Sequence, residues 1–255
     1  MSDMIPYGSQ WLDEDDIAAV VEVLRGNWLT TGPHVDQFEK GLAEACGTTH
    51  AIAVNSGTAA LHAAYHAVGL TCGEEIITSP LTFAATANAA LYLGATVRFV
   101  DVKEDTGNLD PALVAEALTP NTRIIAPVDY AGHPADYNAL QPIATAHGAA
   151  LVADAAHSLG GHYHGRPVGQ LADATALSLH PIKPITTGEG GAVVTNDPDI
   201  ADRARSFRSH GFVRDPERMT RQDEGPWYAE QHVLGFNYRL TDIQCGLGNS
   251  QLTKL

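Results

Sequence analysis

Seven short apolar runs, rich in β-branched residues, recur along the chain and alternate with longer alanine-rich or amphipathic stretches. The runs cover residues 51–55, 75–79, 96–102, 123–130, 150–156, 174–179 and 191–196. Runs of this length without polar alternation are typical of strands buried on both faces of a sheet. Between them, residues 58–70, 83–95 and 138–149 are alanine-rich and contain a late glycine that favours a left-handed cap. The pattern predicts an α/β fold with a mostly parallel seven-stranded sheet and helices on both faces.

The two ends of the chain add further predictions. Residues 13–26 indicate an amphipathic helix with acids in the first turn and an arginine in the last, and residues 198–211 indicate an arginine-rich one. Residues 212–241 show no hydrophobic periodicity. In a compact domain, such a long irregular segment is typical of a functional or interface segment. Residues 241–255 are helical in pattern and have no closing cap, so we expect the chain to be cut short.

Composition narrows the class of protein. The 255 residues are 44% hydrophobic and 18% charged, which is sufficient for one large domain. Thirty acidic and fifteen basic residues give a net charge of −15, which disfavours nucleic acid and anionic membranes as partners. With no long apolar span and no signal peptide, a cytoplasmic location is expected. Three scattered cysteines without a CxxC pair support neither a disulfide framework nor a metal site.

The residues that follow the predicted strands carry the candidate chemistry, because open parallel sheets bind ligands beyond the carboxyl ends of their strands. One predicted strand leads directly into a helix through Ser56, Gly57 and Thr58. Backbone N–H groups and hydroxyls converge there, as in a phosphate-binding site. A plain serine or threonine cap is the alternative. Phe83 follows the next strand, where its ring can cover a flat ligand or belong to the core.

Two further strands end in charged residues. Asp154 ends a buried run, and a buried acid needs a cation or an N–H donor as a partner. The next strand leads through Ser178 and His180 to Lys183, one of four lysines, which stands between two prolines that restrict the backbone. An ordinary solvated lysine needs no such frame. The predicted cofactor is pyridoxal 5′-phosphate, because the site combines a phosphate-binding site, an aromatic face, a buried acid and a positioned amine. This cofactor forms a Schiff base with lysine, and a carboxylate keeps its ring nitrogen protonated.

Several long motifs resemble the nucleotide-sugar aminotransferases of the DegT/DnrJ type, which are fold-type I pyridoxal-phosphate enzymes. Among them are VNSGTAALH, TSPLTFAATANAALYLGA, DAAHSLGG, HPIKPITTGEGG and LGFNYRLTDIQ. The resemblance implies that residues 1–255 form the cofactor-binding large domain of such an enzyme, acting as a homodimer. It implies Lys183 and Asp154 as catalytic residues. The implied cofactor ligands are Gly57, Thr58, Phe83, Asp154, His157, Ser178, Lys183 and, from the neighbouring subunit, Asn237.

Within that family, HPIKPITTGEGG and EGPWYAEQHVLGFNYRLTDIQ are most similar to the enzymes of pseudaminic acid synthesis. That subgroup transfers an amino group, normally from L-glutamate, to C4 of a UDP-linked 4-keto-6-deoxy-N-acetylhexosamine. A plain turn after the first helix also explains residues 27–30. The same resemblance implies that the sugar substrate contacts Tyr7, Asn27, Trp28, Leu29, Thr30 and His180.

Other interpretations remain open. The chain could act on a different nucleotide-linked keto sugar, or be a non-catalytic relative that binds the cofactor. Lys183 argues against a related sugar dehydratase, which has histidine at that position, and the glycine fingerprint of a nicotinamide dehydrogenase is missing. Family members continue for on the order of a hundred further residues that form a smaller domain. We therefore expect a truncated chain that seats the cofactor but handles the sugar poorly.

Overall fold

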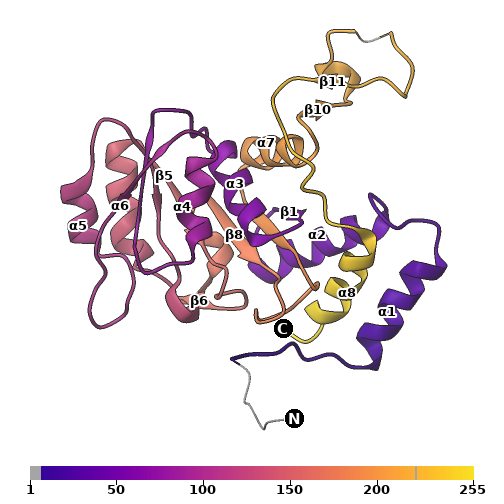
Figure 1. Ribbon diagram of the computed structural model, residues 1–255, viewed down its shortest axis with the longest axis horizontal. Coiled ribbons are helices and arrows are strands. Elements are labelled where there is room, and N and C mark those ends of the chain that lie inside the picture. Colours follow the sequence, from indigo (N-terminus) through magenta and orange to yellow (C-terminus); the bar gives the residue numbers. More distant parts are fainter. Residues whose placement is uncertain (1–6, 222) are drawn as a thin grey trace.

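The computed structural model describes residues 7–221 and 223–255, and a seven-stranded sheet forms its centre (Figure 1). The strand order is β1-β9-β8-β5-β4-β2-β3. β9 runs antiparallel to both of its neighbours, whereas the other pairs are parallel. The predicted α/β architecture with a mostly parallel sheet is confirmed. The strands are β1 (His50–Val54), β2 (Glu75–Thr78), β3 (Thr96–Phe99), β4 (Thr122–Ala126), β5 (Ala150–Asp154), β8 (Ala174–Ser178) and β9 (Gly191–Thr195).

Helices cover both faces of the sheet because apolar side chains alternate between the two sides of each strand. In β1, Ile52 and Val54 belong to one core, whereas Ala51 and Ala53 belong to the other. The first core is closed by α3 (Gly57–Ala67), α4 (Ala84–Leu91) and α7 (Pro198–Arg208). The opposite face packs against α2 (Pro33–Cys46), α5 (Pro111–Ala117), α6 (Tyr137–His147) and α8 (Asp242–Leu252). Outside this layer, α1 (Glu14–Arg25) packs on α8.

The predicted helices are present, and residues 7–221 and 223–255 contain two further α-helices. Gly69, Gly94 and Gly148 all have positive φ after their helices, as the late glycines predicted. The unpredicted helices are α2 and α5. The pattern of α2 was nevertheless available, because Val35, Phe38 and Leu42 recur at helical spacing and are buried. Within the described residues, no helix combines the length and the apolar character that crossing a membrane requires.

The edge strand β3 differs from the prediction of a buried strand over residues 96–102. It ends at Phe99, and Thr96, Arg98 and Phe99 are all exposed. β3 pairs only with β2, so its outer side has no partner strand in the part of the chain that the structure describes. A run of apolar residues does not reveal whether its strand is central or at an edge, which accounts for the error.

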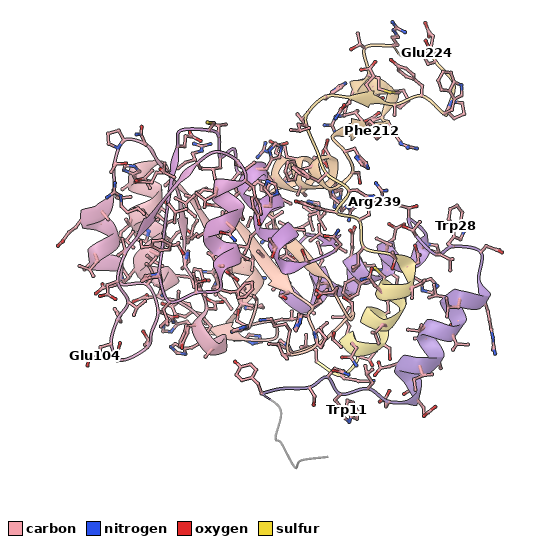
Figure 2. The ribbon with its side chains drawn as sticks, viewed as in Figure 1. Trp11, Trp28, Glu104, Phe212, Glu224 and Arg239 are labelled. Carbon is pink, nitrogen blue, oxygen red and sulfur yellow. The ribbon has the colours of Figure 1, made fainter. Side chains whose placement is uncertain are left out.

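The predicted irregular segment forms an arm that extends away from the sheet (Figure 1). Its base is a two-stranded hairpin of β10 (Phe212–Val213) and β11 (Glu230–Gln231). Phe212 and Glu224 lie on this arm (Figure 2). The chain then returns to the sheet, where Asn55 N–H donates to the carbonyl of Tyr238 at 2.8 Å. A second short hairpin pairs β6 (His162–Tyr163) with β7 (Arg166–Pro167).

Candidate functional site

A crevice of about 850 Å³ is lined by residues that follow the central strands. The parallel strands β1, β5 and β8 end on the same edge of the sheet, which brings residues that are far apart in sequence to one place. Lys183 and Asp154 both line this crevice. The predicted site residues found there are Tyr7, Gly57, Thr58, Phe83, Asp154, His157, Ser178, His180 and Lys183.

The N-terminus of α3 supplies hydrogen-bond donors to the crevice. Ser56 caps the helix, since its Oγ accepts from the N–H of Ala59 at 3.1 Å and its carbonyl accepts from Ala60 at 3.0 Å. The N–H groups of Gly57 and Thr58 therefore have no acceptor within the helix. The side chain of Ser178 lies against Gly57 with no room for a Cβ between them. Two free N–H groups, a neighbouring hydroxyl and the helix dipole suit a phosphate group.

Asp154 is a buried carboxylate at the end of β5. Its Oδ2 accepts from Thr86 Oγ1 at 2.6 Å, and its Oδ1 accepts from the N–H of Ala156 at 3.3 Å. Burial raises the pKa of Asp154, while the hydrogen bond from Thr86 and the charges of His157 and Lys183 lower it. An N–H donor on a ligand in the crevice would favour the ionised form further. The buried carboxylate of Asp154 is therefore stabilised by a cation or an N–H donor, as the sequence predicts for a buried acid.

Lys183 lies on the loop that joins β8 to β9, and that loop is held in place. Its backbone N–H donates to the carbonyl of His180 at 2.9 Å. Thr186 and Thr187 are buried and both hydrogen-bond to the carbonyl of Leu179. Burial lowers the pKa of Lys183, whereas the charge of Asp154 raises it. The loop therefore presents a half-buried amine whose neutral, nucleophilic form is favoured by desolvation.

An aromatic ring and two imidazoles border the crevice. Phe83 is the N-cap residue of α4 and is 78% exposed, so its alternative interpretation as a core residue is wrong. Burial and the charge of Lys183 lower the pKa of His157. His180 is exposed, and its Nδ1 is 3.5 Å from the N–H of Ile182. The ring of Phe83 can cover a flat ligand, and the lowered pKa of His157 favours a neutral imidazole beside it.

Five of the predicted residues do not line this crevice, namely Asn27, Trp28, Leu29, Thr30 and Asn237. The loop at 27–30 is attached to the start of α8, where the N–H of Asp242 donates to the carbonyl of Leu29 at 3.0 Å. Trp28 lies at the periphery, on the side of α1 and α8 (Figure 2). The carbonyl of Asn237 accepts from Asn55, which does line the crevice. Ligand contact by these five residues stays a prediction.

The sequence interpretation missed several residues of the site. Asp129 follows β4 and lines the crevice, and burial raises its pKa. Its Oδ1 accepts from Tyr137 Oη at 2.7 Å, and its Oδ2 accepts from Ser158 Oγ at 2.6 Å. The rule that found Asp154, an acid after a buried strand, would also have found Asp129. The other missed lining residues with polar side chains are Asn55, Thr82 and Glu189.

Metal binding has no support in the described part of the chain. There, no group of three or more His, Cys, Asp or Glu side chains is placed to hold an ion. The donor set of the crevice instead combines N–H groups, one amine and buried carboxylates, which fits an organic ligand with a phosphate.

Comparison with known proteins assigns the chain to a protein family. The model of the DegT/DnrJ/EryC1/StrS aminotransferase family matches residues 10–255. The chain belongs to this family. It is 43% identical over 255 residues to the UDP-4-amino-4,6-dideoxy-N-acetyl-beta-L-altrosamine transaminase of Campylobacter jejuni strain 81-176, covering 99% of this chain and 65% of that protein.

Solved structures of family members have the same fold. Helicobacter pylori PseC, an aminotransferase involved in the biosynthesis of pseudoaminic acid, superposes with a TM-score of 0.90 at 38% identity, over 98% of this chain and 65% of that one. The PLP-form of the putative sugar aminotransferase Spr1654 from Streptococcus pneumoniae gives a TM-score of 0.88 at 30% identity, over 98% and 66%. The chain therefore spans about two thirds of the length of these aminotransferases.

Proposed function

We propose that residues 1–255 form the cofactor-binding large domain of a pyridoxal-phosphate-dependent nucleotide-sugar aminotransferase. The observation that carries this proposal is the position of two side chains that border one crevice beside the N-terminus of α3: Lys183, from the loop after β8, and Asp154, from the end of β5. Membership of an aminotransferase family and the solved PLP-form of a relative support the choice of cofactor.

Several residues of the crevice have a proposed role toward the cofactor. The N–H groups of Gly57 and Thr58 bind the phosphate together with the hydroxyl of Ser178. Phe83 covers one face of the ring, and His157 borders it. When bound, pyridoxal phosphate supplies an aldehyde that captures amines and a ring that withdraws electrons from the attached carbon.

The chemical work of the chain falls to two side chains. Asp154 holds a proton at the ring nitrogen, because a buried carboxylate is most stable beside a cationic N–H donor. Lys183 Nζ would hold the cofactor and, as a free amine, would move the proton at the donor carbon that bears nitrogen. The desolvation that lowers the pKa of Lys183 makes its neutral amine available for both tasks.

The proposed reaction moves an amino group from L-glutamate to C4 of a UDP-linked 4-keto-6-deoxy-N-acetylhexosamine in the cytoplasm, as part of pseudaminic acid biosynthesis. The names of the Campylobacter and Helicobacter relatives support this acceptor. Tyr7, His180 and the loop at 27–30 are proposed to contact the sugar. A homodimer is proposed, with the exposed Asn237 of each chain reaching the phosphate of its partner.

The test is reductive trapping followed by mass spectrometry. The chain is incubated with pyridoxal phosphate, reduced with borohydride and digested, and the peptide with Lys183 is expected to carry the cofactor. Lys183→Ala should abolish the adduct, whereas Lys103→Ala, at a surface lysine, should not change it. A second measurement follows release of 2-oxoglutarate from L-glutamate and formation of the amino sugar. An adduct on another lysine, or none, would refute the proposal.

A further inference from the structure

Asp154 is held from inside the protein by one short hydrogen bond. Thr86 Oγ1 donates to Asp154 Oδ2 at 2.6 Å, and Thr86 is 0% exposed. The other oxygen, Oδ1, accepts from Ala156 N–H at a much longer 3.3 Å. A carboxylate has about four lone-pair positions, so its capacity is far from used. The two oxygens are thus unequal: Oδ2 is committed to Thr86, and Oδ1 retains most of its accepting capacity.

The hydroxyl of Thr86 is part of a chain with a defined direction. Thr86 Oγ1 lies 2.7 Å from Thr82 Oγ1 and 3.2 Å from the carbonyl of Phe83. A threonine hydroxyl has a single proton. If that proton is donated to the ionised Asp154, Thr82 must be the donor to Thr86. Protons then point from Thr82 through Thr86 to Asp154, and this order favours the charged form of the carboxylate.

Thr86 also connects the carboxylate to the helix that carries Phe83. Both residues belong to the first turn of α4, three positions apart. Tyr65 Oη, from α3, donates to the carbonyl of Thr86 at 3.1 Å and so fixes that turn from inside the core. The first turn of α4 therefore holds both side chains that are proposed to contact the cofactor ring. It carries Phe83, which covers one face of the ring, and through Thr86 it holds Asp154, which faces the ring nitrogen.

We propose that Thr86 is the positioning residue for Asp154, committing Oδ2 within the protein so that Oδ1 meets the N–H of the cofactor ring. This proposal rests on the proposed function, since it concerns the same crevice. Thr86 does not line the crevice and acts only through Asp154. The hydrogen bond from Thr86 also opposes the rise in the pKa of Asp154 that burial causes.

Other charged and titratable groups act on the same carboxylate and must be considered in any pH measurement. Lys183 and His157 favour its charged form. Asp129 disfavours that form, because the two buried acids repel each other. Tyr65 on α3 and Tyr137 on α6 also feel its charge. None of these groups changes in a Thr86 variant, so the comparison isolates the hydroxyl.

The experiment compares cofactor binding by Thr86→Val, which removes the hydroxyl at similar volume, and Thr86→Ser, which keeps it. Thr195→Val is the matched control, since Thr195 is buried and donates to the carbonyl of Asp173 at 2.6 Å, away from the crevice. Thr86→Val is expected to weaken pyridoxal phosphate binding about tenfold or more, because a hydrogen bond to a charged group is lost. Thr86→Ser should remain within about threefold of wild type.

The second readout is the pH at which the absorbance of the lysine-bound cofactor changes. Thr86→Val should shift the pH of this absorbance change, whereas Thr86→Ser and Thr195→Val should leave it unchanged. If Thr86→Val does not fold, Thr86→Ala provides the same comparison. Wild-type protein with no adduct on Lys183 would overturn both this inference and the proposed function. An adduct at Lys183 with equal affinity and equal pH response in Thr86→Val would overturn this inference alone.

Discussion

Ser178 lies so close to Gly57 that a Cβ at Gly57 would stand 2.9 Å from the Cβ of Ser178 and 3.1 Å from its Oγ. Such separations are shorter than normal carbon contacts, so one side would have to move. Gly57 has an ordinary helical backbone, and its requirement is therefore for space and not for an unusual φ. The contact fixes the first turn of α3 against the end of β8, where the phosphate is proposed to bind.

Gly57→Ala should consequently weaken pyridoxal phosphate binding by about tenfold, because two N–H donors and a hydroxyl lose their alignment. The dissociation constant is measured by titration of the cofactor's absorbance. Gly41→Ala is the control, since Gly41 lies on α2 and its new Cβ would meet only the flexible end of Leu252. Equal affinity in the two variants would show that the contact with Ser178 does not matter for the phosphate.

Asp154→Asn should stabilise the cofactor-free chain at neutral pH while impairing cofactor binding. Burial raises the pKa of Asp154, so the unfolded chain loses this proton first as the pH increases. The carboxyl thus costs no stability below its unfolded pKa and an increasing amount as the pH rises toward its folded pKa. We expect a higher Tm for the variant at pH 8, by about 2–4 °C for each kcal/mol, and little difference at pH 3.

Thermal unfolding followed by circular dichroism measures this difference, with Asp105→Asn at an exposed position as the control. A Tm of Asp154→Asn below that of wild type at pH 8 would contradict the burial argument. With pyridoxal phosphate present, wild type should instead have the higher Tm. Only the carboxylate of Asp154, and not the amide of the variant, stabilises a protonated ring nitrogen.

His62 should make the stability of the chain depend on pH between about 6.5 and 4. It is buried in an aromatic cluster, with Nδ1 3.1 Å from Tyr238 Oη and Phe207 edge-on at 4.9 Å between ring centroids. Its Nε2 has no hydrogen-bond partner among the described residues. Burial, with a smaller effect of His66, lowers the pKa of His62 to about 4.

Since the unfolded chain takes up this proton first, stability is present above pH 6.5 and is lost as the pH falls. His62→Asn should remove up to about 1.4 kcal/mol per pH unit from the slope of unfolding free energy against pH. Urea unfolding between pH 7 and pH 5 measures that slope, and His162→Asn, at an exposed histidine, is the control. An unchanged slope in His62→Asn would show that His62 does not govern the pH dependence.

Asp242 should be required to hold the loop at 27–30 and the start of α2. It is 0% exposed, and its carboxylate accepts from the N–H of Gly32 at 2.7 Å and of His34 at 3.0 Å. Asp242→Ala leaves both partly buried donors without this acceptor and should destabilise the chain by about 1–3 kcal/mol. Urea unfolding and hydrogen exchange at residues 32–34 test this, with the exposed Asp36→Ala as the control. Similar stability of the two variants would contradict it.

The central part of the site could be predicted because it depends on where strands end. Lys183, Asp154, Gly57 and Thr58 all follow buried apolar runs, and a parallel sheet brings such positions to one edge. Asp129 obeyed the same rule and was overlooked. The loop at 27–30 was assigned by resemblance alone, and this chain does not place it in the crevice.

The amino-acid sequence by itself determined the α/β class and most of the strands and helices, because periodicity and glycine caps are local properties. It also determined which side chains could do chemistry at the sheet edge. Only the tertiary structure decided that β3 is an exposed edge and that Thr86 donates to Asp154, 68 positions away. Such partners depend on how separate elements pack together, and neither the spacing nor the type of residues along the chain specifies that packing.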